Sequence, residues 1–396
     1  MLQAGVNNAD LLIAMTGADE LNLLCSMTAH GINPNIHTIA RICNPDYTDQ
    51  VYKMQKTFAL SLTVNPEKQA AIEIERLLKF PGFLKRDSFA KGRVEIVELR
   101  VDERSRLCNV ALSELNRVIK CRVLVCAVLR RGDVVAPDGS FVLREGDRIF
   151  VTASTEILAT LLDNLGIITK KVNHVMICGG GRVSYYLAQQ LEKDGMTVRL
   201  IEKDPKHCEE LAALLPKTEI INDDASNTFV LKRENIESCD ALVTATGMDE
   251  LNMIISLYGT KHGVSQVITK LGHMENGSMI DQLPIGSTIW PKDLCCNGIV
   301  RYIRAMHNQT GAAVSVHSIA DGKAEAIEFH VEEKKPYCDR PLKNMKVKQN
   351  ILVACITHGG VTELPGGDSV IREGDTVVVV TTRNDIIYKL DDIFEA

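Results

Sequence analysis

The sequence lacks several features that define whole classes of protein. It has 45 Lys and Arg against 51 Asp and Glu, so it shows no basic excess of the kind that nucleic-acid binders carry. Its longest stretch without Asp, Glu, Lys or Arg runs from Leu21 to Ala40, and asparagine, histidine and proline within it exclude a membrane span. The residues after Met1 have neither the basic start nor the apolar core of a secretory signal. We therefore expect a soluble, cytoplasmic protein that binds no nucleic acid.

Metal-ligand spacings are also missing. Of twelve cysteines, the close neighbours are Cys121 with Cys126 and Cys295 with Cys296, and no C-x-x-C or H-x-x-x-H array occurs. Structural zinc needs four converging ligands, usually from such paired spacings. Most of the other cysteines lie in apolar runs, where cysteine behaves as a small buried hydrophobe. The ten histidines match no catalytic signature. We predict no metal site and no catalytic residue.

Two internal repeats set the organisation of the chain. The sequence DLLIAMTGADELN, which begins at Asp10, recurs 230 residues later as DALVTATGMDELN from Asp240. An REGD turn that begins at Arg144 recurs 228 residues later from Arg372. Two separate blocks at nearly one offset predict a tandem of two units, each repeated once. We expect the four parts to span residues 1–82, 88–168, 171–309 and 312–396.

The third part alternates strands with helices. Apolar runs such as 172–178 and 241–245 predict strands buried on both faces. Residues 182–194 have helical spacing, and Asp204-Pro205 supplies an N-cap and a proline at the first helical position. This alternation predicts an α/β domain with a parallel, Rossmann-like sheet covered by helices on both faces.

The second and fourth parts have a different pattern, typical of small α+β modules. Residues 94–101, 123–129, 140–142 and 148–152 are expected strands, separated by PDG and EGD turns, and helices are expected near Leu112 and Thr155. Residues 326–394 repeat this pattern. A capped amphipathic helix from Asn65-Pro66 to Phe80 should bridge the first two parts. The predicted fold is α/β, with Rossmann-like domains alternating with small α+β modules.

A glycine-rich segment lies between the first strand and the first helix of the third part. Glycines at this place let a pyrophosphate approach the backbone and the helix N-terminus, where free N–H groups and the helix dipole favour anions. A Rossmann-like domain that binds nothing is the alternative. The third glycine position of the fingerprint holds serine, which is small enough for close helix–strand packing. The segment consists of Gly179, Gly180, Gly181, Arg182, Val183 and Ser184.

Glu202 ends the second strand, 23 residues after Gly179. A carboxylate at this place can accept hydrogen bonds from both ribose hydroxyls. It also repels a 2′-phosphate, which favours NAD(H) or an adenosine nucleotide over NADP. Arg199 and Lys203 weaken that argument, although strand alternation should point them away from the ribose.

Other candidate ligand-binding residues follow later strands. In open α/β sheets ligands bind at the carboxyl ends of the strands, so Thr246-Gly247, after the fourth strand, should line the same crevice. Lys270 follows the fifth strand and could face a phosphate, and Asp223-Asp224 follows the third strand, near the adenine side. The alternatives are helix capping by Thr246 or Asp249, capping of the next helix by Asp223-Asp224, and a solvated surface lysine at position 270.

The chain resembles the TrkA family over essentially its whole length. The resemblance rests on the repeat order, on GGGRV with Glu202, on the TGxDELN blocks and on the REGD turns. That family comprises cytosolic nucleotide-binding subunits of bacterial Trk potassium uptake, built from RCK domains. The resemblance implies a non-enzymatic regulatory subunit that binds NAD(H) or ATP/ADP and forms a homo-oligomeric ring. It also implies a place at the inner face of the cell membrane, beneath a Trk-type potassium transporter. Nucleotide-contacting positions of the family fall on Thr16, Gly17 and Arg41 as well.

The chain departs from this family pattern in two places. The counterpart of the strand at Val172 would precede Met1, so the first domain lacks a glycine loop and its first strands, and we expect a truncated N-terminus. The family usually has glycine where Ser184 and Asp223 stand. An NAD-dependent oxidoreductase is the alternative function, but the small modules offer no evident acid–base residue or anion clamp. A scaffold with a non-binding Rossmann domain is the third possibility.

Overall fold

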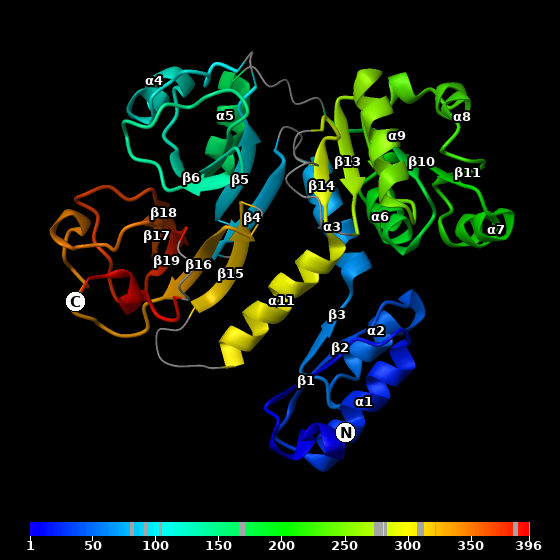
Figure 1. The fold of residues 1–396 in the computed structure, drawn as a ribbon, viewed down its shortest axis with the longest axis horizontal. Helices are drawn as coiled ribbons and strands as arrows, with labels where there is room; N and C mark the ends of the chain where they lie inside the picture. The colour runs from blue at the N-terminus through cyan, green and yellow to red at the C-terminus, as the bar shows by residue number, and fades with distance from the viewer. Residues whose placement is uncertain are drawn as a thin grey trace.

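The computed structural model describes residues 1–79, 83–90, 93–102, 105–165, 171–272, 280, 283–306, 313–320, 322–382 and 387–395. Parallel and antiparallel sheets alternate along the chain, as Figure 1 shows, which confirms the predicted α/β class. Among the described residues, no helix is both long and apolar enough to cross a membrane.

The second parallel sheet has six strands in the order β11-β10-β9-β12-β13-β14, all parallel. The chain runs outward from the central strand β9 to β11 and then returns to β12 on the other side of β9. The carboxyl ends of β9 and β12 therefore flank the switch point of the sheet, where ligands of such folds bind. Its strands are β9 (His174–Cys178), β10 (Thr197–Glu202), β11 (Glu219–Asn222), β12 (Ala241–Thr244), β13 (Gln266–Lys270) and β14 (Ser287–Ile289), and its helices are α6 (Arg182–Lys193), α7 (Pro205–Leu214), α8 (Thr228–Arg233), α9 (Asp249–Lys261) and α11 (Pro291–Met306), with a 3-10 turn η5 (Ile236–Ser238).

The first parallel sheet has three described strands in the order β1-β2-β3, and β1 lies at its edge. On that edge Ile13 is 41% exposed and Met15 is 44% exposed, whereas their repeat counterparts Val243 and Ala245 are 0% and 3% exposed. The difference arises because β12 pairs with β9, and β1 has no such neighbour among the described residues. The elements are η1 (Leu2–Ala4), η2 (Val6–Asn8), β1 (Leu11–Ala14), α1 (Asp19–Ile32), β2 (His37–Arg41), α2 (Pro45–Lys53), β3 (Leu62–Val64) and α3 (Pro66–Lys79).

The last helices of the two parallel-sheet units are exchanged between them. Ala71, Ile74 and Leu78 of α3 are fully buried in the core of the second sheet, where α3 packs on α6. Conversely, Cys295 and Ile299 of α11 lie in the core of the first sheet and contact β3. Figure 1 shows α3 between the two parallel sheets and α11 running diagonally past it, alongside β15. The sequence predicts that α3 bridges the first two parts of the chain, whereas in the structure it packs mainly on α6 and α11 and so joins the two parallel-sheet units. Its expected last residue, Phe80, lies outside the described residues.

The two antiparallel sheets pack face to face. Phe89, Ile96 and Phe150 of one sheet share a buried cluster with Ala326 and Val378 of the other. The first has the order β4-β5-β8-β6-β7 and the second β15-β16-β19-β17-β18. The elements are β4 (Lys85–Phe89), β5 (Val94–Arg100), η4 (Leu112–Glu114), α4 (Leu115–Ile119), β6 (Leu124–Arg130), β7 (Asp133–Val135), β8 (Arg148–Ala153), α5 (Thr155–Leu165), β15 (Ala313–Ile319), β16 (Ala324–His330), η6 (Leu342–Asn344), β17 (Ile351–His358), β18 (Val361–Glu363), β19 (Thr376–Thr381) and η7 (Leu390–Ile393).

One predicted strand of these modules is wrong. Residues 140–142 form no strand, and only Val142 makes an isolated bridge, to Ala111. The reason is local: Asp138 Oδ1 accepts hydrogen bonds from the N–H and the hydroxyl of Ser140, which closes a turn in place of an extended chain.

Candidate functional site

The glycine-rich loop lies directly against the turn that follows β12. Gly179 has a φ of 98°, and a Cβ there would lie 2.8 Å from the Cα of Thr246. Neither a left-handed conformation nor this approach suits a residue with a side chain. A Cβ on Gly180 would lie 2.7 Å from Leu211, whereas a Cβ on Gly181 would have nothing within 4 Å. The first two glycines are therefore required by packing inside the protein, and Gly181 faces open space.

The backbone donors of the loop are partly used within the protein. The N–H of Gly179 donates to the carbonyl oxygen of Ile201 at 2.8 Å, and the N–H of Gly180 donates to Glu202 Oε2 at 2.7 Å. The N–H of Gly181, at the N-cap of α6, has no acceptor among the described residues. The first-turn N–H groups of a helix also have no intrahelical partner. The donors left for an anion are thus those of Gly181 and the first turn of α6.

The three residues after the loop have different environments. Arg182 is exposed, but the side chain of Val183 is buried in the hydrophobic core, so only its backbone N–H can reach a ligand. Ser184 is fully buried, which confirms that a small residue at the third glycine position lets α6 pack closely on the sheet. Its hydroxyl oxygen is buried and has no hydrogen-bond partner among the residues that the structure describes.

Glu202 closes the loop from the neighbouring strand. Its Oε2 accepts from the N–H of Gly180, and its Oε1 accepts from the N–H of Asp204 at 2.9 Å. These bonds fix the carboxylate beside the glycine loop, and each oxygen keeps a second lone pair for a ribose hydroxyl. Arg199 points away, since its Nε pairs with Glu219 at 2.7 Å. The sequence interpretation of Glu202 thus has matching geometry, with an additional structural role for the side chain.

Thr246 and Lys270 are joined by a residue that the sequence analysis did not single out. Asn252 Oδ1 accepts from the N–H and the hydroxyl of Thr246, both at 2.8 Å, and its Nδ2 donates to the carbonyl oxygen of Lys270 at 3.0 Å. Lys270 Nζ donates to the carbonyl oxygen of Thr246 at 2.7 Å. Burial lowers the pKa of Lys270, and Asp249 and Glu67 oppose that effect. Gly247 is exposed beside this group.

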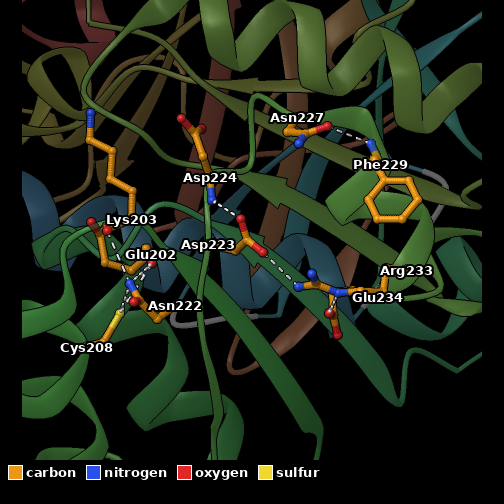
Figure 2. Close-up of polar contacts among 10 residues, drawn as sticks. All are labelled: Glu202, Lys203, Cys208, Asn222, Asp223, Asp224, Asn227, Phe229, Arg233 and Glu234. Carbon is orange, nitrogen blue, oxygen red and sulfur yellow. Dashed lines mark hydrogen bonds and ion pairs between the residues drawn. The ribbon is translucent and has the colours of Figure 1, made fainter.

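The acidic pair after β11 borders Glu202. Asp224 is exposed, and its pKa is lowered by hydrogen bonds from Ser226. Asp223 replaces the expected glycine, and its Oδ2 pairs with Arg233 Nη2 at 2.8 Å, while Arg233 Nε also pairs with Glu234 at 2.8 Å. Figure 2 shows this pair, with the side chains of Lys203 and Asp224 extending to the same side from the ends of β10 and β11. The positive charge of Lys203 also helps to lower the pKa of Asp224, so Lys203 lies near this candidate site residue.

The first sheet repeats the Asn252 arrangement without a described glycine loop. Asn22 Oδ1 accepts from the N–H of Thr16 at 2.7 Å, and its Nδ2 donates to the carbonyl oxygen of Arg41 at 2.9 Å. Gly17 follows in the same turn, with nothing within 4 Å of an added Cβ. Arg41 is thus the structural counterpart of Lys270, although its Nε is buried and has no hydrogen-bond partner within the described part of the chain.

The structure adds four residues to those proposed from the sequence: Asn22, Asn252, Arg233 and His207. The repeated asparagine of the DELN blocks, Asn22 and Asn252, could have been found because it recurs at the same place in both copies. Arg233 and His207 had no such signal. His207 Nε2 lies 2.9 Å from the carbonyl oxygen of Gly180, a contact between residues 27 positions apart.

Comparison with known proteins gives a consistent result. The TrkA-N domain model matches residues 1–62 and 175–291, and the TrkA-C domain model matches residues 96–166 and 326–394. The chain is 29% identical over 389 residues to Trk system potassium uptake protein TrkA homolog 1 of Methanosarcina mazei, covering 96% of this chain and 85% of that protein. It is 27% identical over 400 residues to TrkA of Haemophilus influenzae, covering 99% and 86%.

Solved structures agree on the fold. The GsuK RCK domain superposes with a TM-score of 0.59 at 15% identity, covering 95% of this chain and 78% of that one. The GsuK channel bound to NAD superposes with a TM-score of 0.57 at 15% identity, covering 96% and 66%. With its paired TrkA-N and TrkA-C domains, the chain belongs to the TrkA family.

Proposed function

We propose that this chain is the nucleotide-sensing regulatory subunit of a potassium uptake system. It controls a membrane transporter of the Trk type and catalyses no reaction itself. The family and the relatives named as Trk potassium uptake proteins support this proposal. We assign residues 1–82 and 171–309 to its Rossmann-like domains and residues 88–168 and 312–396 to its smaller modules.

The observation that carries the proposal is the convergence of the predicted site residues at one edge of the second parallel sheet. Gly179 approaches Thr246, Gly180 bonds to Glu202, and Lys270 bonds to Thr246. The free N–H of Gly181 and the start of α6 lie between the carboxylate and the Thr246 turn along this edge. Such a set suits a pyrophosphate on the loop and a ribose on Glu202.

The ligand class we propose is NAD(H), with ATP or ADP as the alternative adenosine nucleotides. The Glu202 carboxylate disfavours a 2′-phosphate, and Arg199 is engaged by Glu219. Lys203, whose charge acts on Asp224, is the cation that opposes this preference. The GsuK channel, which shares this fold, has been solved with NAD bound. The described part of the first sheet offers Thr16, Gly17 and Arg41 but no glycine loop. We therefore propose one nucleotide per chain, held by the second Rossmann-like domain.

Isothermal titration with NAD, NADH, ATP, ADP and NADP tests the ligand assignment. We expect one site per chain and binding of NADP at least about tenfold weaker than that of NAD, which corresponds to about 1.4 kcal/mol. Two equivalent sites would contradict the assignment to one domain. Steady NADH turnover with a panel of carbonyl compounds would instead support an oxidoreductase.

The partner assignment needs its own experiment. We propose that the chain forms a homo-oligomer that docks at the inner face of the cell membrane on a Trk-type potassium transporter. Coupling of nucleotide binding to transport requires different affinities in two assembly states, typically about 1–3 kcal/mol per ligand. Co-purification with a Trk-type transporter, with and without NADH, should retain the chain. Loss of association under both conditions would contradict the proposed partner.

A further inference from the structure

His207 lies in the first turn of α7 and contacts the glycine-rich loop. Its Nε2 is 2.9 Å from the carbonyl oxygen of Gly180, and its Nδ1 is 3.1 Å from Glu210 Oε2. Both partners are hydrogen-bond acceptors. A neutral imidazole carries one N–H and can satisfy only one of them, whereas the imidazolium donates to both. The geometry therefore suits the protonated side chain.

The Gly180–Gly181 peptide group links this histidine to the ligand site. In a trans peptide the carbonyl oxygen and the following N–H point in opposite directions, so fixing the oxygen of Gly180 also fixes the N–H of Gly181. That N–H is the loop donor left without an acceptor among the described residues. The N–H of Gly180 is meanwhile held by Glu202. Glu202 and His207 thus clamp the loop from both sides of Gly180.

The charges around His207 stabilise its protonated form. Glu210 faces it from its own helix and Glu202 from the end of β10, while the glycine loop presents the Gly180 carbonyl oxygen. Partial burial alone would lower the pKa of His207, but the bonds to Glu210 and Gly180 and the two carboxylate charges outweigh it and raise the pKa above its usual value. The protonated form is therefore stabilised below that raised pKa and is lost as the pH rises through it.

We propose that His207 is a positioning residue of the nucleotide site, which when protonated aims the Gly181 N–H at the ligand's phosphate and makes nucleotide affinity depend on pH. This inference rests on the proposed nucleotide-binding function. Loss of the proton removes the charge-assisted bond to Gly180 or to Glu210 and a positive charge near an anionic ligand. Affinity should consequently be highest at low pH and fall as the pH rises.

The experiment measures NAD affinity by isothermal titration from about pH 6 to about pH 9. NAD is the suitable probe because its pyrophosphate diester does not titrate in this range, whereas the terminal phosphate of ADP does. We expect the affinity of the unmodified chain to fall by about tenfold, equivalent to 1.4 kcal/mol, across the range. His207→Gln, which can donate to Gly180 without titrating, should flatten the profile. His207→Arg, which keeps a cation throughout, should hold the affinity high at the alkaline end.

Two further variants separate positioning from folding. Glu210 is largely exposed, with a side chain 71% accessible, so Glu210→Gln should leave the fold intact and move the midpoint of the pH profile to lower pH. His174, exposed at the start of β9, is the matched control, and His174→Gln should leave the profile unchanged. Melting temperatures of all variants monitor folding.

The possible failures are distinct. NAD binding that is independent of pH, or a His207→Gln profile equal to that of the unmodified chain, overturns the role of His207 and leaves nucleotide sensing intact. A Glu210→Gln midpoint that does not move also overturns it. An absence of nucleotide binding at every pH overturns both this inference and the proposed function.

Discussion

Lys270 and Thr246 are joined by a hydrogen bond of 2.7 Å from the ammonium Nζ to the backbone carbonyl oxygen. This bond links the carboxyl ends of β13 and β12 at the point where the glycine loop also packs. It holds a positive charge at the crevice, because the side chain is partly buried and cannot swing freely into solvent.

Lys270→Met should weaken NAD binding by about fivefold to tenfold, since a charge-assisted interaction with a phosphate contributes about 1.5–3 kcal/mol before local compensation. Isothermal titration provides the measurement. Lys261→Met, at the exposed end of α9, is the control that removes a lysine from the same domain. Equal affinities for the two variants would show that Lys270 has only a structural role.

Glu202→Ala should weaken NAD(H) binding by at least about tenfold. The change removes the acceptor proposed for the ribose and also releases the N–H of Gly180 from its fixed orientation. Titration calorimetry measures the effect, with Glu209→Ala as the control on the exposed face of α7. Unchanged affinity in Glu202→Ala would rule out this carboxylate as a ligand contact.

Substitutions at two glycines should separate binding from folding. Gly181→Trp adds its side chain where the protein has open space, so we expect binding stoichiometry near zero with an unchanged melting temperature. Gly179→Ala forces a Cβ against the Thr246 backbone in a left-handed conformation, so we expect both binding and melting temperature to fall. Equilibrium dialysis and thermal unfolding distinguish the two outcomes. Retained binding in Gly181→Trp would place the nucleotide elsewhere.

Asn252→Ala should destabilise the second parallel-sheet unit by about 2–4 kcal/mol, because it leaves the Thr246 N–H and the Lys270 carbonyl oxygen without partners in a fully buried place. Asn252→Asp keeps the acceptor and loses the donor, so an intermediate loss is expected. Asn22→Ala tests the equivalent residue of the first sheet. Denaturant unfolding measures the stability of all three variants. An unchanged free energy of unfolding in either alanine variant would contradict the predicted role of the asparagine.

Arg130→Ala should destabilise the first antiparallel module by about 2–4 kcal/mol. Arg130 Nε and Nη2 each lie 2.7 Å from Asp147, which is 1% exposed and would be left as an uncompensated buried charge. Arg130→Lys keeps the charge without the paired geometry and should lose less. The repeat places His358 at the equivalent position, 2.7 Å from Asp375. Thermal unfolding of both variants tests the order of the losses.

Local sequence patterns predicted the elements of the second parallel sheet well. Residues 241–244 form a strand within the predicted range 241–245, α6 begins at the predicted Arg182, and Asp204 caps α7 with Pro205 at the first helical position. These features depend on neighbours within a few positions, through apolar runs, caps and turns. The tandem order of the domains was predictable for the same reason, because both copies carry the same DELN motif.

The tertiary structure decided what local patterns cannot contain. Helix α3 packs against the second parallel-sheet unit, and α11 packs against the first. This exchange depends on contacts between separate repeats. Which loop donor stays available is equally non-local. Glu202 and His207, 22 and 27 positions away, hold the N–H and the carbonyl oxygen of Gly180, while the N–H of Gly181 has no acceptor among the described residues. The sequence determined which groups were present at the loop, and three-dimensional packing decided which of them remain available to a ligand, because a donor is free only when no distant side chain reaches it.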